Sequence, residues 1–553
     1  MKRLPVLASL ITCLAVTLLA AAPVAGASGG VAPRRAGVTG HLDGVTVGPG
    51  GGTPGTSENF QLVGHDPLFG RGMNAAATIY GNYMYIGNRT DGSSTCGFGD
   101  PRGAPGTLNC PHIHPGVLIE DISNPADPRV VGEIGPPLEG NVGITSREVR
   151  VWPAQKLLVV MNFRCSFFLH ACPRGNDTLF PFDLAFYSLA DPLHPALIST
   201  YVPTSASGLQ VKPHEMYLWQ DPNNPNRALL WISTPELTSD PSVPNMLIVD
   251  ISKVPSGGAP TLIAQGTWNG LFENGGSETF FQFDLYTHSM APTADGTTTY
   301  LSMEGGEMLV LDTSSVVEND PPAGTVINLN NDLISPPANR PIWGNPINTC
   351  TKQCPEGHSA VPVPGRPYVL TTDEIYGTFT DPTFGCPWGW VHLISVADPA
   401  HPAIVGEYKI AQDDQSFCGS AADDPATEQF TSYSSHNPTV LPDLAFVDWH
   451  SGGVQAIDIS DPASPQQAGW FSPTPLPSVA TEDPALSNGP NKVVMWSYPI
   501  IRNGLIYVID IRNGLYILRY TGPHADEVAD IHFLEGNSNL GDAVALSENG
   551  NGQ

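Results

Sequence analysis

Four histidines recur along the chain at similar intervals, and each precedes or opens a run of residues typical of a β-strand. They are His214, His288, His358 and His436, which are 74, 70 and 78 residues apart. In a repeated sheet architecture, equivalent positions lie at the same end of equivalent strands, so these imidazoles would meet at one opening. Imidazole nitrogens that converge from separate strands are typical ligands of iron, copper or zinc. We therefore predict that the four histidines bind a divalent transition metal.

Acidic residues end the strands that follow three of these histidines. They are Glu304, Glu374 and Asp448. Neighbouring strands of a meander run in opposite directions, so the end of the second strand lies beside the start of the first. A carboxylate there can accept the free ring N–H of a ligating histidine. We expect these three acids to support the metal ligands from behind.

Two further residues fit the same opening less strongly. His450 follows Asp448 by two residues, and Arg147 stands at the corresponding strand start of another repeat unit. Arg147 could bind an anionic group of a substrate or form an ion pair. A structural role also remains open for the four histidines, because an imidazole can hydrogen-bond to the backbone of a neighbouring unit.

The residues from 435 to 472 show which elements would position these side chains. This stretch contains four short strand-like runs, residues 437–441, 444–448, 453–459 and 467–471. The breaks between them are Pro-Asp, Ser-Gly-Gly and Ser-Asp-Pro, which are typical of tight turns. Four strands joined by tight turns form an antiparallel meander, as in one blade of a propeller.

The same pattern recurs six times, and the two ends of the repeated region supply a seventh unit. Residues 59–64 resemble the last strand of a unit, and residues 492–520 contain the three strands that would precede it. We therefore predict an all-β fold, a seven-bladed β-propeller over residues 58–522 whose closing blade combines N- and C-terminal segments. Two β-sandwiches are the alternative.

The segments outside this region differ in composition. Residues 1–27 have the basic start, apolar core and small-residue cleavage site of a secretory signal, so we expect a secreted, extracellular protein without a membrane span. Residues 28–57 are rich in Gly, Pro, Ala and Ser and predict a disordered leader. Residues 523–553 form a C-terminal tail.

Charge and cysteine content narrow the range of partners. The net charge of −29 argues against nucleic acids and anionic membranes, and favours a small-molecule substrate or an extracellular ligand. Eight cysteines follow the signal, an even number that predicts disulfides in an exported chain. Pairing between sequence neighbours is a guess, since connectivity does not follow from sequence. The eight are Cys96, Cys110, Cys165, Cys172, Cys350, Cys354, Cys386 and Cys418.

Short motifs at the end of the third strand resemble a known repeat. Residues 246–252, Met-Leu-Ile-Val-Asp-Ile-Ser, and residues 456–465, Ala-Ile-Asp-Ile-Ser-Asp-Pro-Ala-Ser-Pro, are similar to the LVIVD repeat of secreted bacterial β-propeller proteins. The resemblance covers nearly all of the chain after the signal and implies the architecture, but it implies no particular chemistry. We interpret the aspartates of this motif as turn residues, because Asp and Ser oxygens can accept hydrogen bonds from loop amides.

The expected site is similar in pattern to two groups of propeller enzymes. The carotenoid-cleaving oxygenases hold iron with four axial histidines and acids behind them, and the selenium-binding, methanethiol-oxidising propellers are a second parallel. These likenesses imply a metal-dependent oxidoreductase, by analogy of the site alone. The rival hypothesis is a non-enzymatic extracellular binding or scaffold propeller, and a hydrolase is a third.

Overall fold

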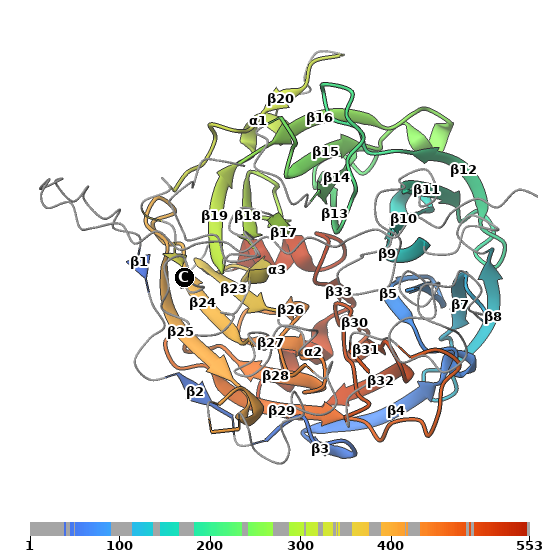
Figure 1. Ribbon diagram of the computed structural model, residues 1–553, viewed down its shortest axis with the longest axis vertical. Coiled ribbons are helices and arrows are strands. Elements are labelled where there is room, and N and C mark those ends of the chain that lie inside the picture. The colour runs from blue at the N-terminus through green and yellow to red at the C-terminus, as the bar shows by residue number, and fades with distance from the viewer. Residues whose placement is uncertain are drawn as a thin grey trace, which may run out of the picture. The chain divides into compact units, whose positions relative to one another are not determined.

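The strands of the computed structural model form seven small, mainly antiparallel sheets around a central axis, which confirms the predicted seven-bladed β-propeller (Figure 1). In blades 1 to 6 the first strand lies innermost, and in every blade the fourth strand lies toward the rim. The structure describes residues 38–39, 45–48, 50–89, 113–135, 144–164, 182–234, 242–268, 287–303, 306–318, 324–335, 339, 341–342, 357–374, 389–414, 416–417, 432–482, 486–487 and 491–549.

The first two blades are joined by one backbone pairing, between Asn88 and Ser146. Blade 1 consists of β5 (Asn74–Tyr80), β6 (Tyr83–Asn88), β7 (Val117–Asp121) and β8 (Arg129–Ile134). Blade 2 consists of β9 (Ile144–Trp152), β10 (Leu157–Arg164), β11 (Asp183–Ser188) and β12 (Ala196–Tyr201).

Blades 3 and 4 each carry a short strand of two residues on the rim side. Blade 3 consists of β13 (Met216–Gln220), β14 (Ala228–Ser233), β15 (Met246–Asp250), β16 (Thr261–Gly266) and β20 (Ile327–Asn328). Blade 4 consists of β17 (Thr287–Pro292), β18 (Thr298–Met303), β19 (Glu307–Asp312) and β21 (Pro341–Ile342), with β1 (Val38–Thr39) beside β21.

Blades 5 and 6 have the same four-strand meander. Blade 5 consists of β22 (Gly357–Pro362), β23 (Tyr368–Asp373), β24 (Val391–Ser395) and β25 (Ala403–Lys409), with β2 (Thr46–Val47) beside β25. Blade 6 consists of β26 (Pro438–Val440), β27 (Leu444–Asp448), β28 (Val454–Asp458) and β29 (Gln466–Ser472), with β3 (Thr56–Glu58) beside β29. The sequence predicted a disordered leader over residues 28–57. The structure instead places β1, β2 and most of β3 within this range, and each of these short strands pairs at the rim of a blade.

Blade 7 closes the ring as predicted. It consists of β30 (Ile500–Arg502), β31 (Leu505–Asp510), β32 (Gly514–Tyr520) and, from the N-terminal side, β4 (Phe60–Asp66). The pairing of β4 with β32 extends from Phe60 opposite Tyr520 to Asp66 opposite Leu515. Such a closure leaves no free sheet edge between the first and last blades.

The turn motif of the repeat has the expected physical role. Asp121, Asp250 and Asp458 each accept a hydrogen bond at Oδ1 from the amide two residues later, at 2.9, 2.7 and 2.9 Å. The turns also pack against glycines in the rim strands of the preceding blade. A Cβ added to Gly64 would lie 2.0 Å from the Pro125 carbonyl oxygen, and one added to Gly406 would lie 2.0 Å from that of Pro462. A side chain at either position would force neighbouring blades apart.

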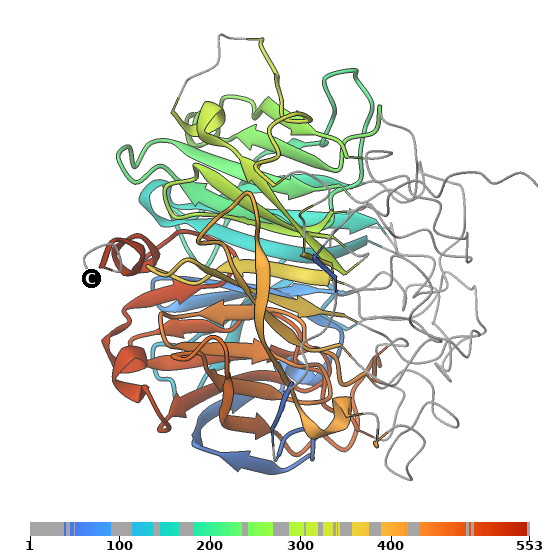
Figure 2. The same ribbon diagram turned by 90° about the vertical axis from the view of Figure 1, so that its left-hand side faces the viewer.

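The segment predicted to be a C-terminal tail closes one end of the central channel. It contains α2 (Ala525–Asp530), β33 (Phe533–Glu535) and α3 (Ala543–Asn549), and β33 pairs with β30 on the inner side of blade 7. Asn537 donates from Nδ2 to the Met216 carbonyl at 2.7 Å and accepts from Arg150 Nε at 3.3 Å. Thr78 of blade 1 donates to Glu535 at 3.4 Å. Figure 2 shows α2 and α3 together on one face of the ring.

The remaining helices are short, and the core lies between the blades. A single-turn helix, α1, spans Ser314–Val317, and 3-10 turns cover Leu68–Gly70, Pro153–Gln155, Val254–Ser256 and Ala411–Asp413. The largest apolar cluster joins blades 3 to 6, where Trp219, Trp231 and Trp449 are buried. No helix within the described residues is long and apolar enough to span a membrane. Residues 1–27 and all eight cysteines after them lie outside the described residues, so the signal and the disulfides stay predictions.

Candidate metal centre

The four predicted histidines stand at the axial start of four successive blades. His288 and His358 are the second residues of β17 and β22, whereas His214 and His436 precede β13 and β26 by two residues. The pairing register of β17 with β18 and of β22 with β23 skips the histidine in both cases. Such a bulge leaves one residue without a cross-strand partner and redirects its side chain, here toward the axis.

These side chains form a continuous arc of imidazole rings. The ring centroids of His214 and His288 are 4.4 Å apart, those of His288 and His358 3.9 Å, and those of His358 and His436 3.8 Å. His450 extends the arc, since its ring centroid lies 4.7 Å from that of His436. His288, His358, His436 and His450 are at most 2% exposed. The structure therefore brings together all four predicted histidines and His450, which the sequence also placed near this opening.

Glu374 lies among the histidine nitrogens, whereas the sequence analysis expected it to accept the outer ring N–H of a ligating histidine. Its Oε1 is 3.2 Å from His436 Nε2 and 3.5 Å from His450 Nε2. Its Oε2 is 3.6 Å from His358 Nε2 and 3.8 Å from His288 Nε2. The carboxylate therefore faces four imidazoles at once, in the position of a ligand.

The other two predicted acids have different outcomes. Glu304 lies outside the described residues. Asp448 is buried, but neither of its carboxylate oxygens has a hydrogen-bond partner among the described residues, and burial together with the charge of Asp510 raises its pKa well above the usual value. Asp448 supports the centre through its backbone instead, because its carbonyl accepts a hydrogen bond from the His436 amide at 2.8 Å.

A second carboxylate, which the sequence analysis did not single out, lies on the inner side of the arc. Glu215 Oε1 is 3.5 Å from His358 Nε2 and 3.9 Å from His288 Nδ1. Tyr498 donates to Glu215 Oε2 at 3.4 Å. Glu215 follows a predicted ligand directly, but alternation along a strand would place its side chain opposite to that of His214. No other feature of the sequence indicates that Glu215 belongs to the site.

A buried ion pair lies between this carboxylate and the C-terminal segment. Arg150 donates from Nη2 to Glu148 at 2.9 Å, and both side chains are at most 2% exposed. Burial and the charge of Glu148 raise the pKa of Glu215 well above its usual value. The channel therefore contains a charged layer below the histidine arc.

A hydrogen bond at Nδ1 sets the tautomer of His436. His436 Nδ1 is 2.7 Å from the Trp496 carbonyl, which can only accept, so this nitrogen carries the proton. His358 Nδ1 is 2.9 Å from Ser359 Oγ, a hydroxyl that can donate or accept. The His436 ring therefore presents the lone pair of Nε2 toward Glu374. This is the form in which histidine binds a metal.

Burial favours the neutral form of four rings of the arc. Desolvation lowers the pKa of His288 to about 3, and it lowers the pKa of His214, His358 and His450 well below the usual value. Burial alone would raise the pKa of Glu374, but the adjacent His436 and His358 hold it well below the usual value. A carboxylate and several neutral imidazoles, with lone pairs in one small space, match the donor set of a transition metal.

Two arginine side chains lie near the axis on blades that carry no histidine of the arc. Arg147 Nη2 lies 3.3 Å from His214 Nε2, at one end of the arc. Arg89 and Arg147 each lie 5.0 Å from the ring centre of Trp496. Arg89 also depresses the pKa of His450, after burial and the neighbouring His436. The centre therefore has a histidine sector and a sector with two guanidinium groups.

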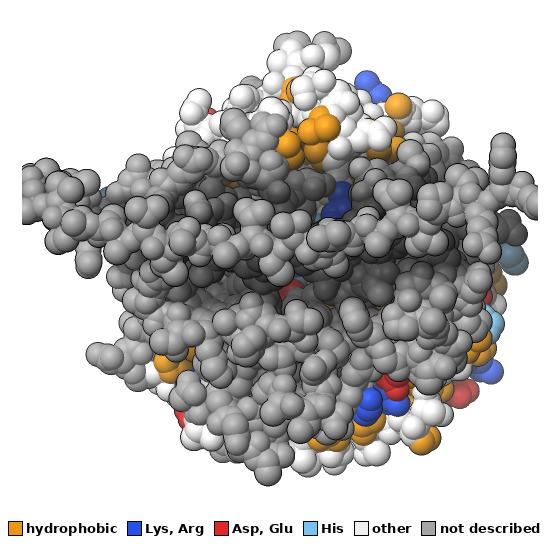
Figure 3. Space-filling view, viewed as in Figure 1, with side chains coloured by type: hydrophobic (Ala, Val, Ile, Leu, Met, Phe, Trp, Pro, Cys, Tyr) orange, Lys and Arg blue, Asp and Glu red, His pale blue; other side chains and the backbone are white. Residues whose placement is uncertain are grey.

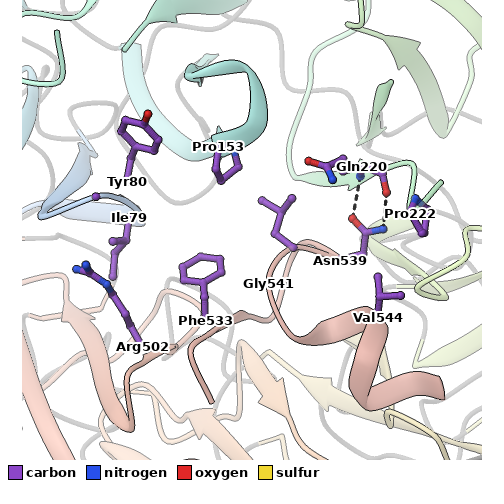
Figure 4. Close-up of a pocket in the computed structure, with 12 residues that line it drawn as sticks. Ile79, Tyr80, Pro153, Gln220, Pro222, Arg502, Phe533, Asn539, Gly541 and Val544 are labelled. Carbon is purple, nitrogen blue, oxygen red and sulfur yellow. Dashed lines mark hydrogen bonds between the residues drawn. The ribbon is translucent and has the colours of Figure 1, made fainter. Parts of the chain in front are cut away.

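Figure 3 views the face that carries the histidines, and near its centre a basic and an acidic side chain of described residues are visible. A separate cavity of about 520 Å³ lies at the opposite ends of the first strands, among Tyr80, Gln220, Arg502, Phe533 and Leu540 (Figure 4). No histidine of the arc lines it. We place the chemistry at the histidine face because the convergent donor groups are there.

Comparisons with known proteins identify no relative by sequence. No family model matches the chain, and no curated protein matches it. Solved structures that resemble it include Sqt1 of Chaetomium thermophilum, with 11% identity, a TM-score of 0.38, and coverage of 82% of this chain and 86% of that one. A periplasmic gluconolactonase of Pseudomonas aeruginosa has 9% identity, a TM-score of 0.39, and coverage of 72% and 88%. Likenesses this remote carry no functional argument.

The geometry alone therefore defines the class of site. Histidine and glutamate side chains from four blades form clusters whose ligand atoms lie within 4.8 Å of one another, so they could hold a metal ion. Nitrogen and oxygen donors suit iron, copper, zinc or manganese, and do not distinguish among them.

Proposed function

We propose that this protein is a secreted metal-dependent enzyme, an oxidoreductase, whose axial centre binds its metal through His214, His288, His358 and His436 together with Glu374. The observation that carries the proposal is the convergence of four buried imidazoles on the buried carboxylate of Glu374. Burial of so many polar groups is unfavourable unless each finds a partner. A metal ion would satisfy several of them at once.

A bound transition metal would supply Lewis acidity and redox chemistry to a substrate at its open positions. The side chains around it would then select and orient that substrate. Arg147 and Arg89 favour an anionic group, because both guanidinium groups lie at the ends of the histidine arc. Trp496 provides a flat apolar surface between them.

The proposal is tested by the metal content of the purified protein. We expect near-stoichiometric iron, copper, zinc or manganese in the parent, and its loss in a His288→Ala/His358→Ala double variant that still folds. His401→Ala is the matched control, since His401 is 63% exposed and pairs with Asp398 at the surface. Oxygen-consumption assays with small organic acids would follow on the loaded protein. Metal absent from the parent after incubation with each ion would contradict the proposal and favour a non-enzymatic binding propeller.

A further inference from the structure

The two oxygens of Glu374 face different pairs of histidines. Oε1 is directed to His436 and His450, and Oε2 to His288 and His358. A carboxylate whose oxygens serve separate donor groups is in the arrangement of a bridging ligand. A carboxylate behind a single ligand would face one imidazole only.

The distances within each group are within a few tenths of an ångström of the spacing of ligands on a shared ion. Two donors bound at 2.0–2.2 Å, at angles of 90° to 109°, lie roughly 3.0 to 3.4 Å apart. The Oε1 group has oxygen–nitrogen distances of 3.2 and 3.5 Å, and the Oε2 group has 3.6 and 3.8 Å. Small side-chain movements would therefore bring either group onto an ion.

The number of donors exceeds what one catalytic ion can use. Five imidazoles and the carboxylates of Glu215 and Glu374 provide seven side chains around the axis. A catalytic zinc ion typically takes three protein ligands and keeps a further position open. A second ion would account for His450 on one side and for Glu215 on the other.

We infer that the axial centre binds two divalent transition-metal ions bridged by Glu374, one with His288 and His358 at Oε2 and the other with His436 and His450 at Oε1. This inference rests on the proposed function, because it requires the centre to bind metal. His214 and Glu215 adjoin the first ion, since His214 Nε2 lies 2.8 Å from His288 Nε2. Ions that share a bridging ligand in two-metal sites lie about 3.5–4 Å apart.

Metal stoichiometry after loading with Mn²⁺, measured by elemental analysis, tests this inference. We expect two equivalents in the parent, one in His450→Ala and two in the surface control His401→Ala. Electron paramagnetic resonance of the Mn²⁺-loaded parent provides a second reading that needs no variant. Two bridged ions give an exchange-coupled spectrum, whereas a single ion gives an isolated six-line spectrum.

The outcomes separate the inference from the proposed function. One equivalent with an isolated spectrum in the parent would overturn the two-ion centre and leave the metal enzyme in place. Two equivalents in both parent and folded His450→Ala would overturn the assignment of the second ion to His450. No binding of Mn²⁺, iron, copper or zinc would overturn both. If His450→Ala does not fold, the spectrum of the parent decides.

Discussion

Two neighbouring carboxylates in blade 5 face two different histidine environments. Asp373 lies within the sheet, where its Oδ2 is 2.8 Å from His392 Nε2, and Glu407 Oε1 is 2.7 Å from the Nδ1 of the same ring. Glu374, the next residue, faces the axial arc. Burial alone would lower the pKa of His392, but Asp373 and Glu407 raise it to about 9. At the axis, burial lowers the pKa of His288 to about 3.

The contrast shows what separates a structural histidine from a candidate ligand. His392 donates from both ring nitrogens to carboxylates, so it has no lone pair for a metal. His358 and His436 use only Nδ1 in hydrogen bonds to protein groups and direct Nε2 to the axis. Burial is equal in the two places, but the distances to carboxylates differ. His392 has two carboxylate oxygens at 2.7 and 2.8 Å, whereas the carboxylate oxygens nearest His358 Nε2 are at 3.5 and 3.6 Å. Four predictions follow this contrast.

The largest effect is expected from Glu374→Gln. An amide cannot supply two anionic oxygens, so metal affinity should fall by more than the roughly 100-fold typical of groups that lie behind the ligands. The measurement is competition for Mn²⁺ against a chelator of known affinity. Asp373→Glu is the comparison variant at the adjacent position. An unchanged affinity in Glu374→Gln would remove Glu374 from the centre.

The reverse result is expected from His392→Leu. This substitution leaves Asp373 and Glu407 buried without their cation, so the free energy of unfolding should fall by about 3–5 kcal/mol. Urea denaturation measures the loss, and metal bound per folded molecule should stay at the parent level. Loss of metal without loss of stability would mean that His392 belongs to the centre and that the contrast is false.

The same ion pair predicts a decline of stability at alkaline pH. Because the pKa of His392 in the folded protein, about 9, lies above the unfolded value near 6.5, its stabilisation is complete below pH 6.5. It is lost as the pH rises through about 9, and the total is roughly 3 kcal/mol. Urea denaturation of the metal-free protein at several pH values measures this slope, and His392→Leu should flatten it. A parent whose stability rises across this range would refute the assignment.

The smallest effect concerns the cationic sector. Removal of one guanidinium in Arg147→Gln should weaken the binding of azide, an anionic probe for open metal positions, by about tenfold, since a charge–charge interaction across partly hydrated space is worth about 1–4 kcal/mol. Optical titration of the metal-loaded protein measures this change. The surface variant Arg129→Gln should bind azide as the parent does. Equal azide affinity in all three proteins would show that the arginine sector does not contact the substrate position.

The sequence predicted the ring because its turns and strands repeat. Histidines at equivalent strand starts could be placed on one face for the same reason, and the short runs near residues 60 and 515 indicated the closing blade. The sequence placed Glu374 beside the histidines but behind them. Its position among the imidazole nitrogens could not be predicted, because no local pattern fixes where its side chain lies relative to residues of other blades. Glu215 lacks any repeat signature, and the contacts of residues 535–539 join distant segments that no local pattern connects.

The C-terminal segment beneath the centre has a consequence for the order in which the molecule matures. All five histidines of the arc precede β32, which closes the ring with β4, and they precede Asn537, which fills the channel from below. During synthesis from the N-terminus, the donor groups are therefore complete before the walls that enclose them. An ion present at that stage would meet an open half-ring. An ion that arrives after closure would have to enter through the histidine face.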